Sequence, residues 1–258
     1  MDLIAPILAM LVLWWSSTGA ILMLGERSER ARFVAMAVVS VFAVIAFAGV
    51  WLLRDVTTPI GAYTGAIAAL TLWGWHEMSF LFGFITGPNS RPCPAGLTGW
   101  PRFRAAAATL MHHELALAAT VVVLGVMSLG AHNPVALQLF SLLFALRLSS
   151  KFNLFVGTQH FTDEFLPARL SHLRSYFSPS PAGLFFVVTT SAITALAAFL
   201  FWGAATADTP FAASAFALLG ALAALGALEH LFLALPLPDA ALWRWLLPAR
   251  DPRRTPDL

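Results

Sequence analysis

The sequence has few charged residues and almost no cysteine. Asp, Glu, Lys and Arg make up 11% of its 258 residues, against about 25% in a typical soluble domain. Apolar and aromatic residues make up 59% of the chain, and its mean hydropathy is +0.78. This composition excludes an ordinary soluble domain and predicts that lipid surrounds most of the chain.

Other absences exclude whole classes of function. The single cysteine, Cys93, excludes an intramolecular disulfide and a CxxC-type metal or redox site. The basic residues form no dense block suited to a phosphate backbone, so we expect no nucleic-acid partner. There is also no phosphate-binding glycine loop, nucleophile elbow or dinucleotide fingerprint.

Long apolar runs dominate what remains. A transmembrane helix needs about 20 mainly apolar residues, and the chain offers seven such stretches. They lie at roughly 3–24, 33–53, 60–85, 105–129, 134–156, 182–205 and 210–236. The first lacks a basic flank and is long enough to span, so we read it as a retained helix and not as a signal peptide. The sequence predicts an all-α fold, a polytopic integral membrane bundle of about seven transmembrane helices in one domain over residues 1–242.

Basic residues between these stretches predict the orientation. All but one of the fifteen Lys and Arg residues fall in or beside alternate loops and the C-terminal tail, and Arg54 is the exception. By the positive-inside rule the N-terminus lies outside and the C-terminus inside, in a bacterial inner (cytoplasmic) membrane. Residues 87–104 and 157–181 become cytoplasmic loops, and 243–258 a cytoplasmic tail.

Two finer features concern packing. Apolar residues recur at near-helical spacing in 157–181, which favours an amphipathic segment at the membrane interface. Gly220 and Gly226 stand among many alanines in the last span, which indicates close contacts between helices.

Ionisable residues within the spans are the candidate site. Each costs roughly 2.5–3.5 kcal/mol at the centre of a membrane helix, so each calls for a partner or a purpose. Three predicted spans carry them at similar depth in the inner leaflet, and Arg147 and Lys151 add positive charge from a fourth. The candidates are His76, Glu77, His112, His113, Glu114, Glu229 and His230.

The residue types fit three chemistries, which the sequence leaves open. Histidine can ligate a transition metal such as iron, or the central metal of a tetrapyrrole, while glutamates bridge or orient. However, adjacent His and Glu side chains diverge by about 100° around a helix, unlike the Glu-x-x-His pairs of bundle di-iron sites. The third interpretation is a polar core in which these groups satisfy one another and fix the helix register.

Several motifs in the middle of the chain follow one another in a distinctive order. They are Trp73-Gly74-Trp75-His76-Glu77-Met78-Ser79-Phe80-Leu81, Thr86-Gly87-Pro88 with Cys93-Pro94, His113-Glu114-Leu115-Ala116-Leu117-Ala118, Arg147-Leu148-Ser149 with Lys151, Asn153 and Gly157, and Asp163-Glu164-Phe165-Leu166-Pro167 before His172, Leu173, Tyr176 and Phe177. As an ordered set over roughly residues 70–180, they resemble the PuhE-type photosynthetic complex assembly proteins of purple bacteria.

The resemblance implies a role in building the photosynthetic apparatus and an influence on bacteriochlorophyll supply. Reaction-centre or light-harvesting subunits, or pigment-biosynthesis proteins, would then be its partners beside the lipid bilayer. It implies no catalytic residue. Because the matched motifs contain His76, Glu77, His113 and Glu114, we expect these four to hold a bacteriochlorophyll or a precursor transiently, without turnover. A metal-dependent membrane oxidoreductase acting on a lipid-soluble substrate and a ligand-free scaffold are the alternatives.

Overall fold

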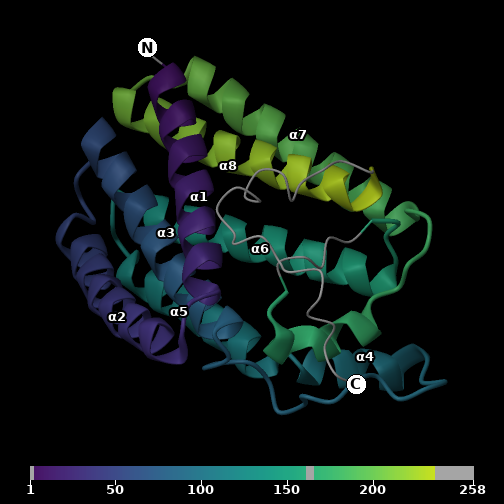
Figure 1. Ribbon diagram of the computed structural model, residues 1–258. Coiled ribbons are helices and arrows are strands. Elements are labelled where there is room, and N and C mark those ends of the chain that lie inside the picture. The colour runs from purple at the N-terminus through teal and green to yellow at the C-terminus, as the bar shows by residue number, and fades with distance from the viewer. Residues whose placement is uncertain (1–2, 161–165, 236–258) are drawn as a thin grey trace.

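A computed structural model describes residues 3–160 and 166–235, and most of these residues are helical (Figure 1). The elements are α1 (Ile4–Gly25), α2 (Glu29–Leu52), α3 (Pro59–Leu81), α4 (Gly99–Ala108), α5 (Met111–Met127), α6 (Val135–Val156), the 3₁₀ helix η1 (Ala168–Tyr176), α7 (Leu184–Thr206) and α8 (Pro210–Ala234). Among the described residues the only β pairing is an isolated bridge between Thr158 and Pro179. The predicted all-α fold is confirmed. The predicted tail 243–258 and the acidic pair Asp163 and Glu164 lie outside the described residues.

Several helices have the length and composition of membrane spans. In the described part of the chain these are α1, α2, α6, α7 and α8, with a sixth span if α4 and α5 together count as one. Helix α3 is as long as the others but carries His76 and Glu77 near its end, and it is not among them. Large apolar side chains such as Val44 on α2 and Trp202 on α7 are exposed, as lipid contact requires. The helices fit a multi-pass membrane protein, while the count of seven and the orientation stay predictions.

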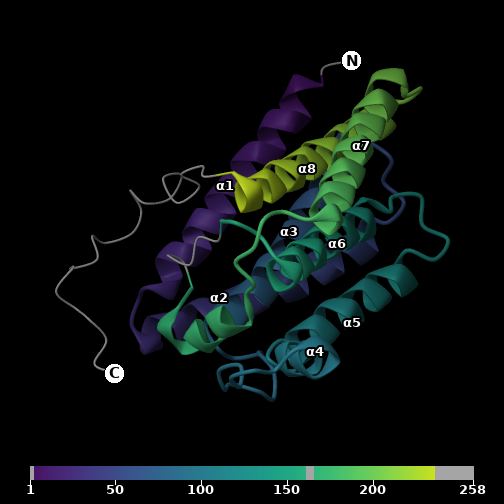
Figure 2. The same cartoon turned by 90° about the vertical axis from the view of Figure 1, so that its right-hand side faces the viewer.

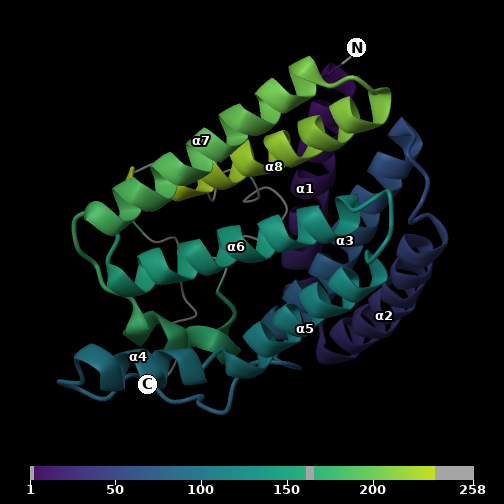
Figure 3. The ribbon, with the colours of Figure 1, turned by 180° about the vertical axis from the view of Figure 1, so that it is seen from behind.

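Helix α6 forms the middle of the bundle. Helices α3 and α8 pack against α6 and against each other. Helix α2 lies beside α3, α7 runs along α8, and α1 crosses α3 and α8 (Figures 1 and 3). Helix α5 packs on α6 and α3 at the edge of the bundle. Helix α4, which precedes α5 in the chain, lies at one end of it (Figure 2). The side chains of α3, α6 and α8 therefore make the core.

Small residues allow the closest approaches in this core. A Cβ atom at Gly226 on α8 would lie 2.6 Å from Leu146 Cδ2 on α6. One at Gly220 would lie 3.0 Å from Phe201 Cδ1 on α7. The predicted role of Gly220 and Gly226 in close helix contacts is confirmed.

Two helices begin with the same local signal. Thr58 accepts a hydrogen bond from the Gly61 amide (3.1 Å) at the start of α3, and Thr209 accepts one from Ala212 (3.1 Å) at the start of α8. Proline follows each threonine at the first helical position, where no amide is needed. These caps fix the starts of α3 at Pro59 and of α8 at Pro210, close to the predicted 60 and 210.

The predicted continuous span 105–129 is wrong. The chain bends by 70° between α4 and α5, and α5 begins only at Met111. The Thr86 carbonyl accepts the His113 amide (3.0 Å), and the Asn89 amide donates to the Ala108 carbonyl (3.2 Å). The segment after α3 thus supplies hydrogen bonds at the point where the helix is interrupted.

The segments predicted to share the inner side do contact one another. Arg102 on α4 donates to the Tyr176 carbonyl (2.5 Å) at the end of η1 and to the Ser178 hydroxyl (2.8 Å). Leu170 and Leu173 of η1 are buried against Phe80, so the predicted amphipathic segment is, in part, a 3₁₀ helix packed on the bundle.

The close packing of Gly87 at the α4–α5 bend predicts that a larger residue there lowers the stability of the protein. A Cβ atom there would lie 2.2 Å from the Ala108 carbonyl oxygen and 2.5 Å from the Thr109 carbonyl carbon, and backbone atoms cannot rotate away. We expect Gly87→Ala to lower the free energy of unfolding by about 1–3 kcal/mol, the usual cost of overpacking, as measured by thermal unfolding in detergent. Gly125→Ala is the control, because its Cβ atom would meet nothing within 4 Å. Equal stability of the two variants would contradict the proposed contact.

Candidate functional site

Two ion pairs connect helices α3 and α5 to α6. Arg147 Nη2 lies 3.3 Å from Glu77 Oε2 on α3, and Lys151 Nζ lies 2.5 Å from Glu114 Oε1 on α5. Arg147 and Lys151 are four residues apart, so one face of α6 presents both cations. The predicted proximity of these cations to the glutamates is confirmed.

The two glutamates keep one oxygen each without a partner. Glu77 Oε1 and Glu114 Oε2 are buried and make no hydrogen bond among the described residues, and the same holds for Arg147 Nε. The Glu77 side chain is only 10% exposed. Each carboxylate is thus anchored at one oxygen and retains capacity at the other.

Two histidines lie together between α3 and α5. The ring centroids of His76 and His113 are 6.4 Å apart, and His76 Nε2 forms a hydrogen bond with the Thr120 hydroxyl (2.8 Å). His113 is fully buried and packs against the Phe80 ring, with 4.7 Å between centroids. Neither of its ring nitrogens has a described partner. As expected, His76 and Glu77 point in different directions, one to α5 and the other to α6.

Both ring nitrogens of His230 form hydrogen bonds within the bundle. Its Nδ1 lies 2.8 Å from the Gly226 carbonyl, and its Nε2 lies 2.8 Å from the Ser149 hydroxyl on α6. A carbonyl only accepts, so Nδ1 carries the proton and Nε2 accepts from Ser149. His230 therefore ties α8 to α6 with no nitrogen left for a ligand.

The predicted metal residues do not meet around one centre. His112 is exposed on α5, while His113 beside it is buried. In the described ranges, no three His, Cys, Asp or Glu side chains are grouped so that they could hold a metal ion. The physical reason is that Glu77 and Glu114 form ion pairs with cations of α6, and His230 forms a hydrogen bond with Ser149.

Two cavities adjoin the ion pairs. The first, about 530 Å³, lies between α4, α5, α6 and η1, and its charged lining residues are Glu114, Arg147 and Lys151. The second, about 330 Å³, lies between α1, α3, α6 and α8, with Glu77, Arg147 and Glu229 on its walls. Arg147 faces both, whereas neither His76 nor His113 lines either one.

Sequence reasoning missed several polar partners. Thr120 and Ser149 bind the ring nitrogens of His76 and His230. A signal existed for Thr120, because it follows His113 by seven residues and so lies on the same face of the helix. Ser149 belongs to the Arg147-Leu148-Ser149 motif, but nothing in the sequence indicated that it would bind His230.

The comparisons with known proteins cover nearly the whole chain. A family model described as "Protein of unknown function (DUF3623)" matches residues 1–254. The chain belongs to this family. It is also 35% identical over 256 residues to an "Uncharacterized 30.4 kDa protein in puhA 5'region" of Rhodobacter capsulatus, covering 96% of this chain and 92% of the relative. No solved structure matches. Similarity to known proteins thus extends well beyond residues 70–180.

The Lys151–Glu114 pair predicts a compensation between two substitutions. Lys151→Met leaves a partly buried carboxylate without its cation, and we expect the free energy of unfolding to fall by about 1–3 kcal/mol. Adding Glu114→Gln removes the unpaired charge and restores most of that loss, as measured by chemical unfolding in detergent. Arg54→Met, which breaks an exposed pair with Asp55, serves as the control and should matter much less. A double variant that is less stable than Lys151→Met would exclude this coupling.

Proposed function

We propose that this protein assists assembly of the bacterial photosynthetic apparatus by transiently holding a bacteriochlorophyll or a precursor. The ligand lies in the cavity between α4, α5, α6 and η1. That cavity is the observation that carries the pigment part of the proposal. The name of the Rhodobacter capsulatus relative, which refers to the puhA 5′ region, and the resemblance to PuhE-type proteins support the photosynthetic setting.

The cavity suits a large flat apolar molecule. Its volume of about 530 Å³ falls within the range of roughly 300–1,000 Å³ usual for ligand pockets. Aromatic rings come from four different elements, and flat π-systems pack favourably on such rings. The rings belong to Phe80, Phe103, Phe144, Phe152, Phe155, Tyr176 and Phe177.

Glu114 is the residue that fits the pigment's metal. A bacteriochlorophyll supplies a magnesium ion, which prefers oxygen ligands. Glu114 lines the cavity, Lys151 holds its Oε1, and its Oε2 has no described partner. His76 and His113 do not line the cavity, so we assign this contact to Glu114 in place of either imidazole.

Pigment binding would explain how the protein assists assembly. A membrane protein that holds a pigment without converting it can influence bacteriochlorophyll supply and pass the pigment on in the cytoplasmic membrane. Reaction-centre and light-harvesting subunits, or pigment-biosynthesis proteins, would be its partners.

A ligand-free scaffold is the second candidate. The ion pairs favour it, because Glu77 and Glu114 already have cations and His230 has no free nitrogen. A metal-dependent oxidoreductase has less support, because no group of three ligands is found in the described ranges.

An absorption spectrum separates these candidates. Protein purified in mild detergent from a pigmented host should carry a tetrapyrrole at about one per chain. The double variant Glu114→Leu/Lys151→Met removes the ion pair without leaving a lone charge, and we expect it to be colourless. His112→Ala, two residues before Glu114 but exposed, should keep the pigment. A colourless wild-type protein, or pigment retained by the double variant, would contradict the assignment.

Deletion in a phototrophic host tests the assembly role separately. We expect the absorbance of reaction-centre and light-harvesting complexes per cell to fall severalfold. Wild-type protein and His112→Ala should restore it, and Glu114→Leu/Lys151→Met should not. Unchanged complexes in the deletion strain would rule out the assembly role, whatever the purified protein binds.

A further inference from the structure

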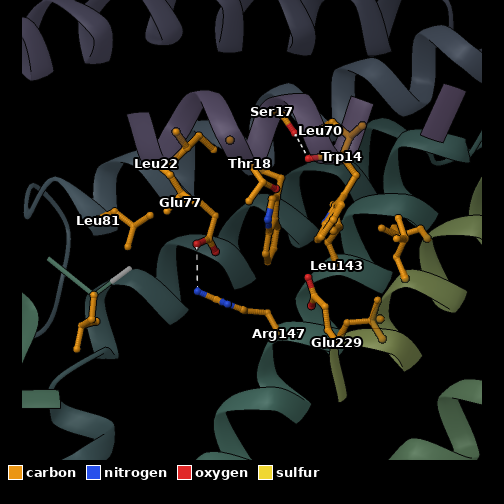
Figure 4. Close-up of a pocket in the computed structure, with 18 residues that line it drawn as sticks. Trp14, Ser17, Thr18, Leu22, Leu70, Glu77, Leu81, Leu143, Arg147 and Glu229 are labelled. Carbon is orange, nitrogen blue, oxygen red and sulfur yellow. Dashed lines mark hydrogen bonds and ion pairs between the residues drawn. The ribbon is translucent and has the colours of Figure 1, made fainter. Parts of the chain in front are cut away.

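The smaller cavity, of about 330 Å³, carries an unbalanced charge (Figure 4). Among the described residues its charged lining consists of two carboxylates, Glu77 and Glu229, and one guanidinium, Arg147. The cavity is walled by helices α1, α3, α6 and α8, four of the helices that make up the bundle. A net negative charge in such a place is costly unless something compensates it.

The excess charge belongs to Glu229 and to one oxygen of Glu77. Arg147 Nη2 lies 3.3 Å from Glu77 Oε2, while the buried Glu77 Oε1 has no partner in the part of the chain that the structure describes. Figure 4 places the Glu229 carboxylate on the wall near Leu143, and no hydrogen bond or ion pair to it is found in the described residues. The single cation is therefore engaged, and the second carboxylate is left over.

The rest of the lining is apolar and aromatic. Trp14 from α1 and Trp73 from α3 contribute indole rings, and leucines from α3, α6 and α8 complete the walls. Indole rings offer large apolar faces on which a hydrocarbon group packs. Ser17 and Thr18 add hydroxyl groups at the α1 side.

We propose that this cavity binds a small amphipathic organic cation, with its ammonium group beside Glu229 and its hydrocarbon part against Trp14 and Trp73. A cation neutralises the leftover carboxylate, and the apolar walls bury the hydrocarbon. A proton on Glu229 would also remove the charge, but it would leave the aromatic cavity unfilled. The volume lies at the lower end of the range for ligand pockets, which favours a small molecule.

This inference does not depend on the proposed pigment role. The pigment cavity lies on the other side of Arg147, and the two cavities share only Leu81, Arg147 and Leu166. Either proposal can fail while the other holds.

Phenethylammonium and 2-phenylethanol are a matched pair of probes, equal in heavy-atom count and different in charge. We expect isothermal titration of the detergent-solubilised protein to give at least tenfold tighter binding of the ammonium. Glu229→Gln should abolish that preference. Glu26→Gln, which removes an exposed carboxylate in the α1–α2 loop, should leave it unchanged.

A second variant guards against loss of fold in Glu229→Gln. Trp14→Leu keeps both carboxylates and removes one indole that packs on the hydrocarbon part, so it should weaken binding of both probes severalfold and leave the preference for the ammonium in place. Equal binding of the two probes to the wild-type protein would overturn the proposal. So would absence of binding together with an infrared band of a protonated carboxyl that disappears in Glu229→Gln, since the site would then hold a proton.

Discussion

Two cations on one face of α6 set the arrangement of the helices around them. A charged side chain within a membrane bundle must find a partner, because the cost of leaving it alone amounts to several kcal/mol. Arg147 takes its partner from α3 and Lys151 takes its partner from α5. Since both cations lie within one helical turn, α3 and α5 have to approach α6 at nearly the same level. His76 and His113 are brought to within 6.4 Å of each other as a consequence.

The bend between α4 and α5 gives this arrangement its open side. A straight helix over 105–129 would place the residues before Met111 in line with α5. The 70° bend instead turns α4 away from that line. Residues from both sides of the bend, Phe103 and Leu115 among them, then line the same cavity. The close approach of Gly87 to the Ala108 and Thr109 backbone holds the bend in place. The cavity proposed for the pigment is thus a product of backbone geometry more than of any single side chain.

The sequence could predict what depends on local pattern. Apolar length located the long helices, and the starts of α3 and α8 also carry a local signal that apolar length does not include, a threonine followed by proline. The cost of intramembrane charge pointed to side chains that form ion pairs and hydrogen bonds inside the bundle, and helix geometry foresaw that His76 and Glu77 diverge. The bend before Met111 was beyond reach, because it depends on hydrogen bonds from Thr86 and Asn89, far away in the chain. For the same reason the sequence could not tell that His113 would be sealed off while Glu114, the next residue, faces a cavity.

Arg147 stands between two cavities of different character. On the side of α4 and α5 it joins Lys151 and one carboxylate, Glu114, so positive charge is in excess there. On the side of α1 and α8 it faces two carboxylates, so negative charge is in excess. One guanidinium cannot neutralise the charge of both cavities. Arg147 forms its ion pair with Glu77, on the side of α1 and α8. The two proposed sites would therefore select ligands by different means, the first by aromatic surface and a single carboxylate oxygen, the second by an unpaired carboxylate.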